Sequence, residues 1–108
     1  MGQQNPIATQ NLPAPYVVCP ASETTPLGSA GVAGNLLIGL LVVPLTTSPG
    51  EVQISDGGTN EEVFAGGASS VASLVPFFIP WNAPSVNGGY SVVTGANVKV
   101  YAFGNFSF

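Results

Sequence analysis

Hydrophobic and polar residues alternate in short runs along the chain, and no stretch repeats its apolar residues at helical spacing. Residues 51–55 alternate strictly, so a strand there would put Val52 and Ile54 on one face and polar side chains on the other. Residues 98–103 alternate too, with large side chains on both sides, so both faces of that strand are expected to be partly covered. The other strands predicted from β-prone runs are residues 16–19, 36–43, 62–65, 71–79 and 90–94.

Glycines and prolines mark the ends of these runs. Residues 56–60 (DGGTN) predict a tight hairpin, because glycine accepts positive φ angles and aspartate can bond its own backbone. Residues 21–34 and 81–89 are rich in glycine, proline and small polar residues, and they are predicted to be loops. Pro76 and Pro80 have no backbone N–H, so the strand at 71–79 is expected at a sheet edge or with a bulge.

The strongest apolar run, residues 36–43, is interrupted only by Gly39 and is typical of a strand covered on both faces. It is far shorter than the roughly 20 residues that a membrane-spanning helix needs. Near the end of the chain, Phe106 and Phe108 point the same way, so the chain is expected to end inside a sheet. The whole pattern predicts an all-β fold: an antiparallel β-sandwich or small barrel of about seven to eight short strands.

Residues 1–15 predict an extended N-terminal arm ahead of a single β-domain at residues 16–108, since they contain three prolines and five amide side chains but few large apolar groups. Two interpretations stay open: a loose terminus, or an arm that docks on a neighbouring protein. The candidate partner-binding residues are Gln3, Gln4, Asn5, Ile7, Leu12, Tyr16 and Trp81. The first ten residues contain no basic residue and no apolar run of signal-peptide length, so no secretion signal is expected.

Charged side chains are scarce. The chain of 108 residues has one Lys or Arg, five acidic residues and no His, for a net charge of −4. Binding to nucleic acid is not expected, because phosphate chains are held by clusters of Lys and Arg. An ordinary surface of mixed Lys and Glu cannot be built when charged residues make up 6% of the chain. We therefore expect part of the outside to be covered by a partner protein.

The same scarcity limits catalysis, and we expect no enzyme activity, cofactor or metal. Without His there is no Ser–His or Cys–His pair, and Lys99 is interpreted as a charge that protects an edge strand. Cys19, the only cysteine, permits no intrachain disulfide and is expected to be a buried, inert thiol. Asp56 with Glu61 or Glu62 could form the carboxylate pair of a glycosidase, but they are interpreted as the polar residues of a hairpin turn.

From about Pro26 to Phe108 the chain resembles small β-rich proteins of tailed bacteriophage particles, in particular head decoration (cement) proteins. The resemblance lies in the type of the segments and in their order along the chain, and it includes no catalytic motif. The segments that carry it are the strand from Gly34-Asn35-Leu36 to Val43-Pro44, Thr47-Ser48-Pro49-Gly50, Val52-x-Ile54-x-Asp56-Gly57, Val63-Phe64-Ala65-Gly66-Gly67 and Thr94-Gly95-Ala96-Asn97-Val98.

This resemblance implies a virion protein that is made in the host bacterial cytoplasm and added to the outside of an icosahedral shell, often as a homotrimer. Its partners would be the major capsid protein and other copies of itself, with no nucleic acid and no membrane. Residues 1–15 would then reach across the shell. Within the same structural class, a tail or neck subunit is a further possibility.

A second hypothesis is an adhesive or glycan-binding module of a phage fibre or tail. It would use Trp81, Tyr90 and Tyr101 as stacking platforms, placed on loops at one end of the domain. A small hydrolase acting through Glu62 is the third hypothesis and has the fewest supporting features.

Overall fold

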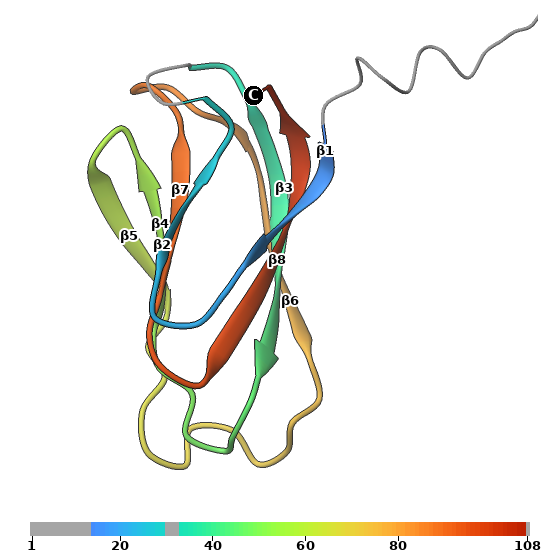
Figure 1. Ribbon diagram of the computed structural model, residues 1–108, viewed down its shortest axis with the longest axis vertical. Helices are drawn as coiled ribbons and strands as arrows, with labels where there is room; N and C mark the ends of the chain where they lie inside the picture. The colour runs from blue at the N-terminus through green and yellow to red at the C-terminus, as the bar shows by residue number, and fades with distance from the viewer. Residues whose placement is uncertain (1–13, 30–32, 108) are drawn as a thin grey trace, which may run out of the picture.

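The computed structural model describes residues 14–29 and 33–107, which form eight β-strands in two antiparallel sheets of four strands each (Figure 1). The first sheet contains, in spatial order, β1 (Ala14–Cys19), β8 (Val98–Phe106), β3 (Leu36–Pro44) and β6 (Phe77–Pro84). The second contains β2 (Thr24–Leu27), β7 (Tyr90–Thr94), β4 (Val52–Asp56) and β5 (Thr59–Phe64). The all-β prediction is confirmed, and the architecture is sandwich-like.

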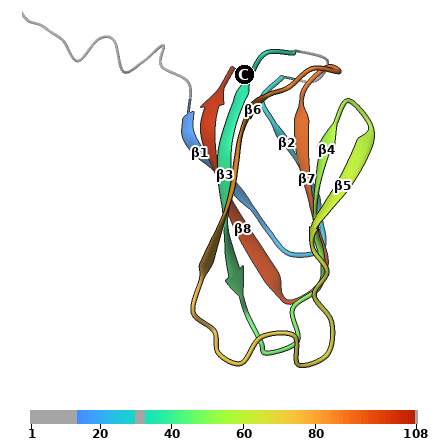
Figure 2. The same cartoon turned by 180° about the vertical axis from the view of Figure 1, so that it is seen from behind.

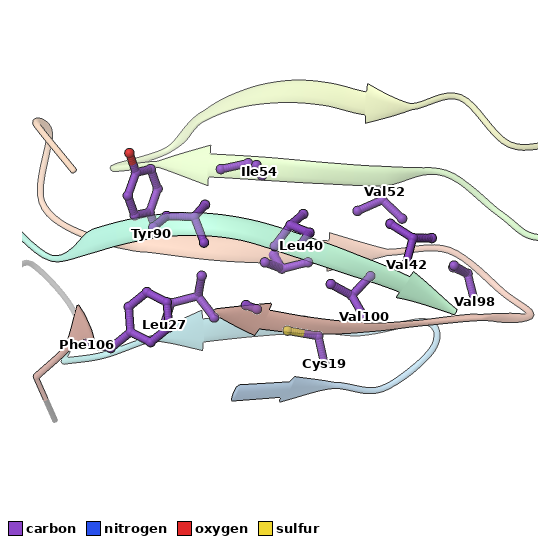
Figure 3. Packing of buried hydrophobic residues seen from close by; sticks show 13 residues of the cluster. Cys19, Leu27, Leu40, Val42, Val52, Ile54, Tyr90, Val98, Val100 and Phe106 are labelled. Atoms are coloured by element: carbon purple, nitrogen blue, oxygen red, sulfur yellow. The ribbon is translucent and has the colours of Figure 1, made fainter. Parts of the chain in front are cut away.

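One hydrophobic layer fills the space between the two sheets (Figure 3). It consists of 13 buried residues, and it forms because strand residues alternate between faces, so every second side chain of each strand meets the opposite sheet. The expected inward set of β8, which is Val98, Val100 and Ala102, is fully buried, as are Val52 and Ile54 of β4. The alternation seen in residues 51–55 and 98–103 thus identified the core side correctly.

The hairpin predicted at residues 56–60 is present and joins β4 to β5. Gly57 and Gly58 both have positive φ, 62° and 99°, which suits the twist of a two-residue hairpin turn. A Cβ at position 57 would also collide with the backbone carbonyl of Asn87, in the β6–β7 loop. Glycine is therefore required here both for the turn and for close contact with that loop.

Strand β2 corrects the prediction of a loop over residues 21–34. Its four residues, Thr24–Leu27, pair only with β7, at the edge of the second sheet. So short a strand is hard to detect in sequence because proline and small polar residues surround it and it gains its hydrogen bonds from a partner distant in sequence. The side chain of Leu27 ends in the common core, at 1% exposure.

Strand β6 corrects two further predictions. It spans Phe77–Pro84 instead of residues 71–79, so Trp81 lies in a strand and not in a loop. Pro80 and Pro84 are tolerated because β6 pairs only with β3 and is the edge of the first sheet, as the prolines predicted. The register between β3 and β6 also shifts between Leu37 and Gly39.

The two ends of the domain differ from the prediction by a few residues. β1 begins at Ala14, two residues before the expected start, and residues 1–13 of the predicted arm lie outside the described residues. β8 continues to Phe106, whose side chain is fully buried, so the last described strand does run into the core as expected. Phe108 lies outside the described residues.

Candidate functional site

The outer side of the first sheet is a broad apolar surface. We name it the aromatic face and define it by the outward side chains of β1, β8, β3 and β6. Two cross-strand rows form its centre. One row joins Val18, Tyr101, Leu41 and Phe78, and the other joins Tyr16, Phe103, Gly39 and Pro80. Four of its side chains are strongly exposed: Phe78 (48%), Tyr16 (47%), Val18 (43%) and Ile38 (41%).

This outer surface shows that β3 is not covered on both faces, as its continuous apolar run had predicted. Leu37, Leu40 and Val42 are buried, whereas Leu36 and Ile38 are exposed. Ile38 is the extra residue of a β-bulge, since two residues of β3 advance against one of β8 at this point. The apolar run therefore reflects one face in the core and one face exposed in the free chain.

Four aromatic rings cross the aromatic face in contact with one another. The ring centroids of Tyr101 and Tyr16 are 5.9 Å apart, those of Tyr16 and Phe103 are 5.9 Å apart, and those of Phe103 and Phe78 are 6.4 Å apart. These separations are typical of favourable tilted aromatic pairs. The rings come from the two edge strands and from β8, so the row spans the sheet.

Gly39 makes this row possible. It lies on β3, between Phe103 of β8 and Pro80 of β6. A Cβ at position 39 would collide with the ring of Phe78 and lie 2.6 Å from the carbonyl oxygen of Ile79. Because the glycine leaves this space free, the Phe78 ring lies over β3 and reaches toward Phe103. The Phe78 ring thereby covers the backbone of Gly39.

The charges of the chain are divided unequally between the two sheets. Lys99, the single basic residue, lies on β8, which is an interior strand and not the edge strand that was predicted for it. Its Nζ atom is 5.1 Å from the centre of the Tyr101 ring, a cation–π distance. All five acidic residues lie on the second sheet or in the turns next to it. They are Glu23, Glu51, Asp56, Glu61 and Glu62. The aromatic face therefore carries one cation and no acidic residue.

The outer side of the second sheet is polar. Asn60 donates a hydrogen bond to Gln53 (3.0 Å), and Gln53 donates one to Glu51 (3.3 Å). A hydrogen bond between the Glu62 and Glu51 carboxyl groups raises the pKa of Glu62. These side chains form a hydrogen-bonded polar row across β4 and β5, which needs no protein partner to be satisfied in water.

The edges of both sheets carry residues that oppose the addition of a further strand. The prolines are Pro15 in β1, Pro26 in β2, and Pro80 and Pro84 in β6. β5 has Glu61 and Glu62 side by side. Prolines remove N–H donors and charges disfavour strand addition, so contact with other proteins is directed to the faces of the sandwich.

The predicted partner-binding residues are separated by the fold. Tyr16 is part of the aromatic face, whereas Gln3, Gln4, Asn5, Ile7 and Leu12 lie outside the described residues. Trp81 faces the inside of the sandwich, where its Nε1 donates to Tyr90 Oη (2.9 Å). That hydroxyl in turn donates to the carbonyl oxygen of Ala83 (2.9 Å), so the pair ties the edge strand β6 to the second sheet.

The three aromatic residues of the glycan-binding hypothesis consequently do not form a cluster on end loops. All three lie in strands: Trp81 in β6, Tyr90 in β7 and Tyr101 in β8. Tyr90 is buried, and burial raises its pKa, whereas Tyr101 belongs to the aromatic face. The loop placement of Trp81 was wrong because the prolines of β6 were interpreted as ends of the strand.

The residues considered for catalysis have other contacts. Both carboxylate oxygens of Asp56 accept hydrogen bonds from the backbone N–H of Val86, at 3.2 and 3.0 Å, and one also accepts from Asn87 at 3.1 Å. Asp56 thereby holds the β6–β7 loop against the β4–β5 hairpin. Cys19 is fully buried, as predicted, and burial raises the pKa of its thiol to about 12.

Within residues 14–29 and 33–107, no three His, Cys, Asp or Glu side chains are grouped so that they could hold a metal ion. No helix of the described chain has the length and apolar character needed to cross a membrane.

The sequence patterns did not predict the aromatic face, although Tyr16, one of its residues, was among the candidate partner-binding residues. Val18, Ile38, Leu41 and Phe78 belong to it, and their signal was the presence of large apolar residues at both odd and even positions of one strand. In a sheet with one wet face, one of these two sets would be polar.

Comparison of the chain with protein-family models, with curated proteins and with solved structures found no match.

Proposed function

We propose that this protein is a structural component of a virus particle, which binds the outer surface of a phage capsid and stabilises the shell by bridging its subunits. The observation that carries the proposal is the aromatic face, a sheet-wide apolar surface on a small domain. Contiguous exposed apolar patches of this kind mark sites where proteins bind one another. The resemblance to head decoration proteins supplies the type of partner.

The rest of the surface supports a role in packing and not in turnover. It is rich in uncharged polar residues, and among its few carboxylates Asp56 is bonded to backbone and Glu62 is paired with Glu51 on the second sheet. Uncharged polar surface suits close packing against protein, because few charges would have to leave water on contact.

The mechanism is thermodynamic linkage. A protein that binds the assembled shell, but not its separated subunits, shifts the assembly equilibrium toward the shell. In this proposal residues 1–13, which enter the fold at the edge strand β1 beside Tyr16, extend the contact area of the domain on the shell.

The first test is quantitative mass spectrometry of purified virus particles. We expect copies in proportion to the major capsid subunits. A handful of copies per particle would contradict shell decoration and indicate a fibre, neck or tail subunit. Absence from the particle would contradict the proposal as a whole.

The second test is removal of residues 1–13 from the full chain. We expect weaker binding to capsids that lack the protein, with an unchanged circular dichroism spectrum, because β1 begins at Ala14 and stays intact. The matched control is the full chain on the same shells. Equal occupancy by the two proteins would contradict the role assigned to this segment.

Glycan binding finds less support in the fold. Sugar recognition needs several polar groups around the stacking ring, yet apart from Lys99 over the Tyr101 ring, the cross-strand neighbours of Tyr16 and Tyr101 on the aromatic face are aliphatic or aromatic. The Trp81 N–H is already bonded to Tyr90. Sugar-dependent quenching of Trp81 fluorescence would favour this second function.

A further inference from the structure

We propose that two copies of this chain pair face to face, about a two-fold axis, through their aromatic faces. The pair is a property of the free protein, and it would open when an aromatic face binds the shell, because both contacts use the same surface. Its basis is that four strands present a continuous apolar centre on the side that does not face the core, with the polar residues Lys99, Asn82 and Asn105 around it. An identical face is apolar over the same extent, so each would remove the other from water.

The size of the aromatic face meets the requirement of a specific interface. Four strands at about 4.8 Å spacing are roughly 19 Å wide, and nine residues at about 3.3 Å each are roughly 30 Å long. This corresponds to about 600 Å² on each copy, or roughly 1,200 Å² for a pair, the lower end of stable, specific interfaces. On each copy it is about a tenth of the 5511 Å² of accessible surface.

The division of charge favours a second copy over a charged partner. Each copy carries a net charge of −4, but its five acidic residues lie on or beside the second sheet. In a face-to-face pair the two second sheets point away from each other, with both first sheets between them. At sheet spacings of about 10 Å, the acidic groups are then separated by more than the Debye length of roughly 8 Å.

Lys99 does not require an acidic partner. It is the second residue of β8, at the end of the strand and so at the rim of the face, and its ammonium group lies over the Tyr101 ring. A rim position leaves the charge in contact with water when the centre of the face is covered. A second copy brings no carboxylate to this face, and none is needed.

The edges of the sandwich exclude the common alternative. Prolines in β1, β2 and β6, and the adjacent glutamates of β5, disfavour pairing through an added strand. Contact through the polar outer side of the second sheet would bring two acidic surfaces together. The aromatic face is therefore the surface through which identical copies associate at the lowest electrostatic cost.

The test is sedimentation velocity of the full chain over a range of micromolar concentrations. We expect a species of twice the 10.9 kDa chain mass that dissociates on dilution. The double variant Val18→Lys with Phe78→Lys places two charges on one row of the face, and its dissociation constant should rise at least about tenfold. The matched control, Val93→Lys, places a lysine on the outer side of the second sheet and should pair normally.

A second measurement needs no substitution. On dilution, backbone amide resonances of β1, β8, β3 and β6 should shift, while those of β2, β7, β4 and β5 should not. A monomer at every concentration would overturn the proposal, as would a trimer or a pair that is broken by Val93→Lys and not by the double variant. Neither measurement involves a shell. Their results therefore test the pairing alone and do not affect the test of the proposed function on virus particles.

Discussion

The two outer faces of this sandwich are built on the same strand geometry but have opposite chemistry. Figure 2 shows the first sheet (β1, β8, β3 and β6) and the second sheet (β2, β7, β4 and β5) on opposite sides of the sandwich. Most outward residues of the first sheet are tyrosine, phenylalanine or aliphatic residues, with Lys99, Asn82 and Asn105 as the polar ones, and four rings contact one another across it. On the second sheet the outward residues are Gln53, Asn60 and Glu62, joined through Glu51. The first face is therefore the one for which we propose a protein partner, whereas the polar groups of the second face are satisfied by one another and by water.

The largest expected loss of stability comes from comparing an inward and an outward residue of β3. Leu40 is fully buried between the sheets, and its neighbour Leu41 faces outward. Leu40→Ala should lower the free energy of unfolding by about 3 kcal/mol, because it leaves a cavity in the core. Leu41→Ala in dilute solution should cost only about 1 kcal/mol. Urea unfolding measures both, and equal losses would mean that the aromatic face is packed within the monomer.

A somewhat smaller effect compares one position on each outer face. Gly39→Val places side-chain atoms where the ring of Phe78 lies, and its Cβ would be 2.6 Å from the Ile79 carbonyl oxygen. We expect a loss of about 2 kcal/mol from this overpacking. Ser55→Val, on the second face, should change stability by less than about 0.5 kcal/mol. Thermal unfolding of both variants tests this, and a neutral Gly39→Val would show that the aromatic row does not depend on the glycine.

The stability of the protein at alkaline pH tests the hydrophobic core between the two sheets, to which Cys19 belongs. The folded Cys19 thiol has a pKa of about 12 against an ordinary value of 9.0, so between these values the folded state holds a proton that the unfolded state has lost. Its contribution to stability is complete below pH 9.0 and falls as pH rises toward about 12, with a slope of at most about 1.4 kcal/mol per pH unit.

Denaturant unfolding at several alkaline pH values would measure this slope. Cys19→Ala is the control and should flatten it. The raised pKa of Tyr90 acts with the same sign, so some slope should remain in the variant. A wild-type curve that is flat above pH 9.0 would contradict the burial of the thiol.

The smallest effect concerns the inner side of the second sheet. The Thr25 hydroxyl is buried without a hydrogen bond of normal geometry, and the Cys19 thiol, a weak partner, is the polar group beside it. Thr25→Val keeps the shape and removes the unsatisfied group, so it should raise stability by up to about 1 kcal/mol. A loss of that size in urea unfolding would instead reveal a partner for the hydroxyl.

Sequence alone predicted the class of the fold and much of its core. Period-two alternation identified the inward residues of β4 and β8, because a strand turns successive side chains to opposite sides whatever surrounds it. The Asp56 hairpin was also predictable, since a two-residue turn with two glycines depends only on local backbone geometry. The scarcity of charged residues predicted that part of the surface is covered, but it gave no indication of which part.

Tertiary structure decided which apolar side chains share a surface. Val18, Tyr101, Leu41 and Phe78 form one row although they lie in four strands spread over the whole described chain. The extent of β2 and β6, the inward turn of Trp81 and the space above Gly39 depended equally on partners distant in sequence. Local patterns determine how a strand alternates, whereas strand order, which sets the neighbours of each side chain, follows from packing the whole chain.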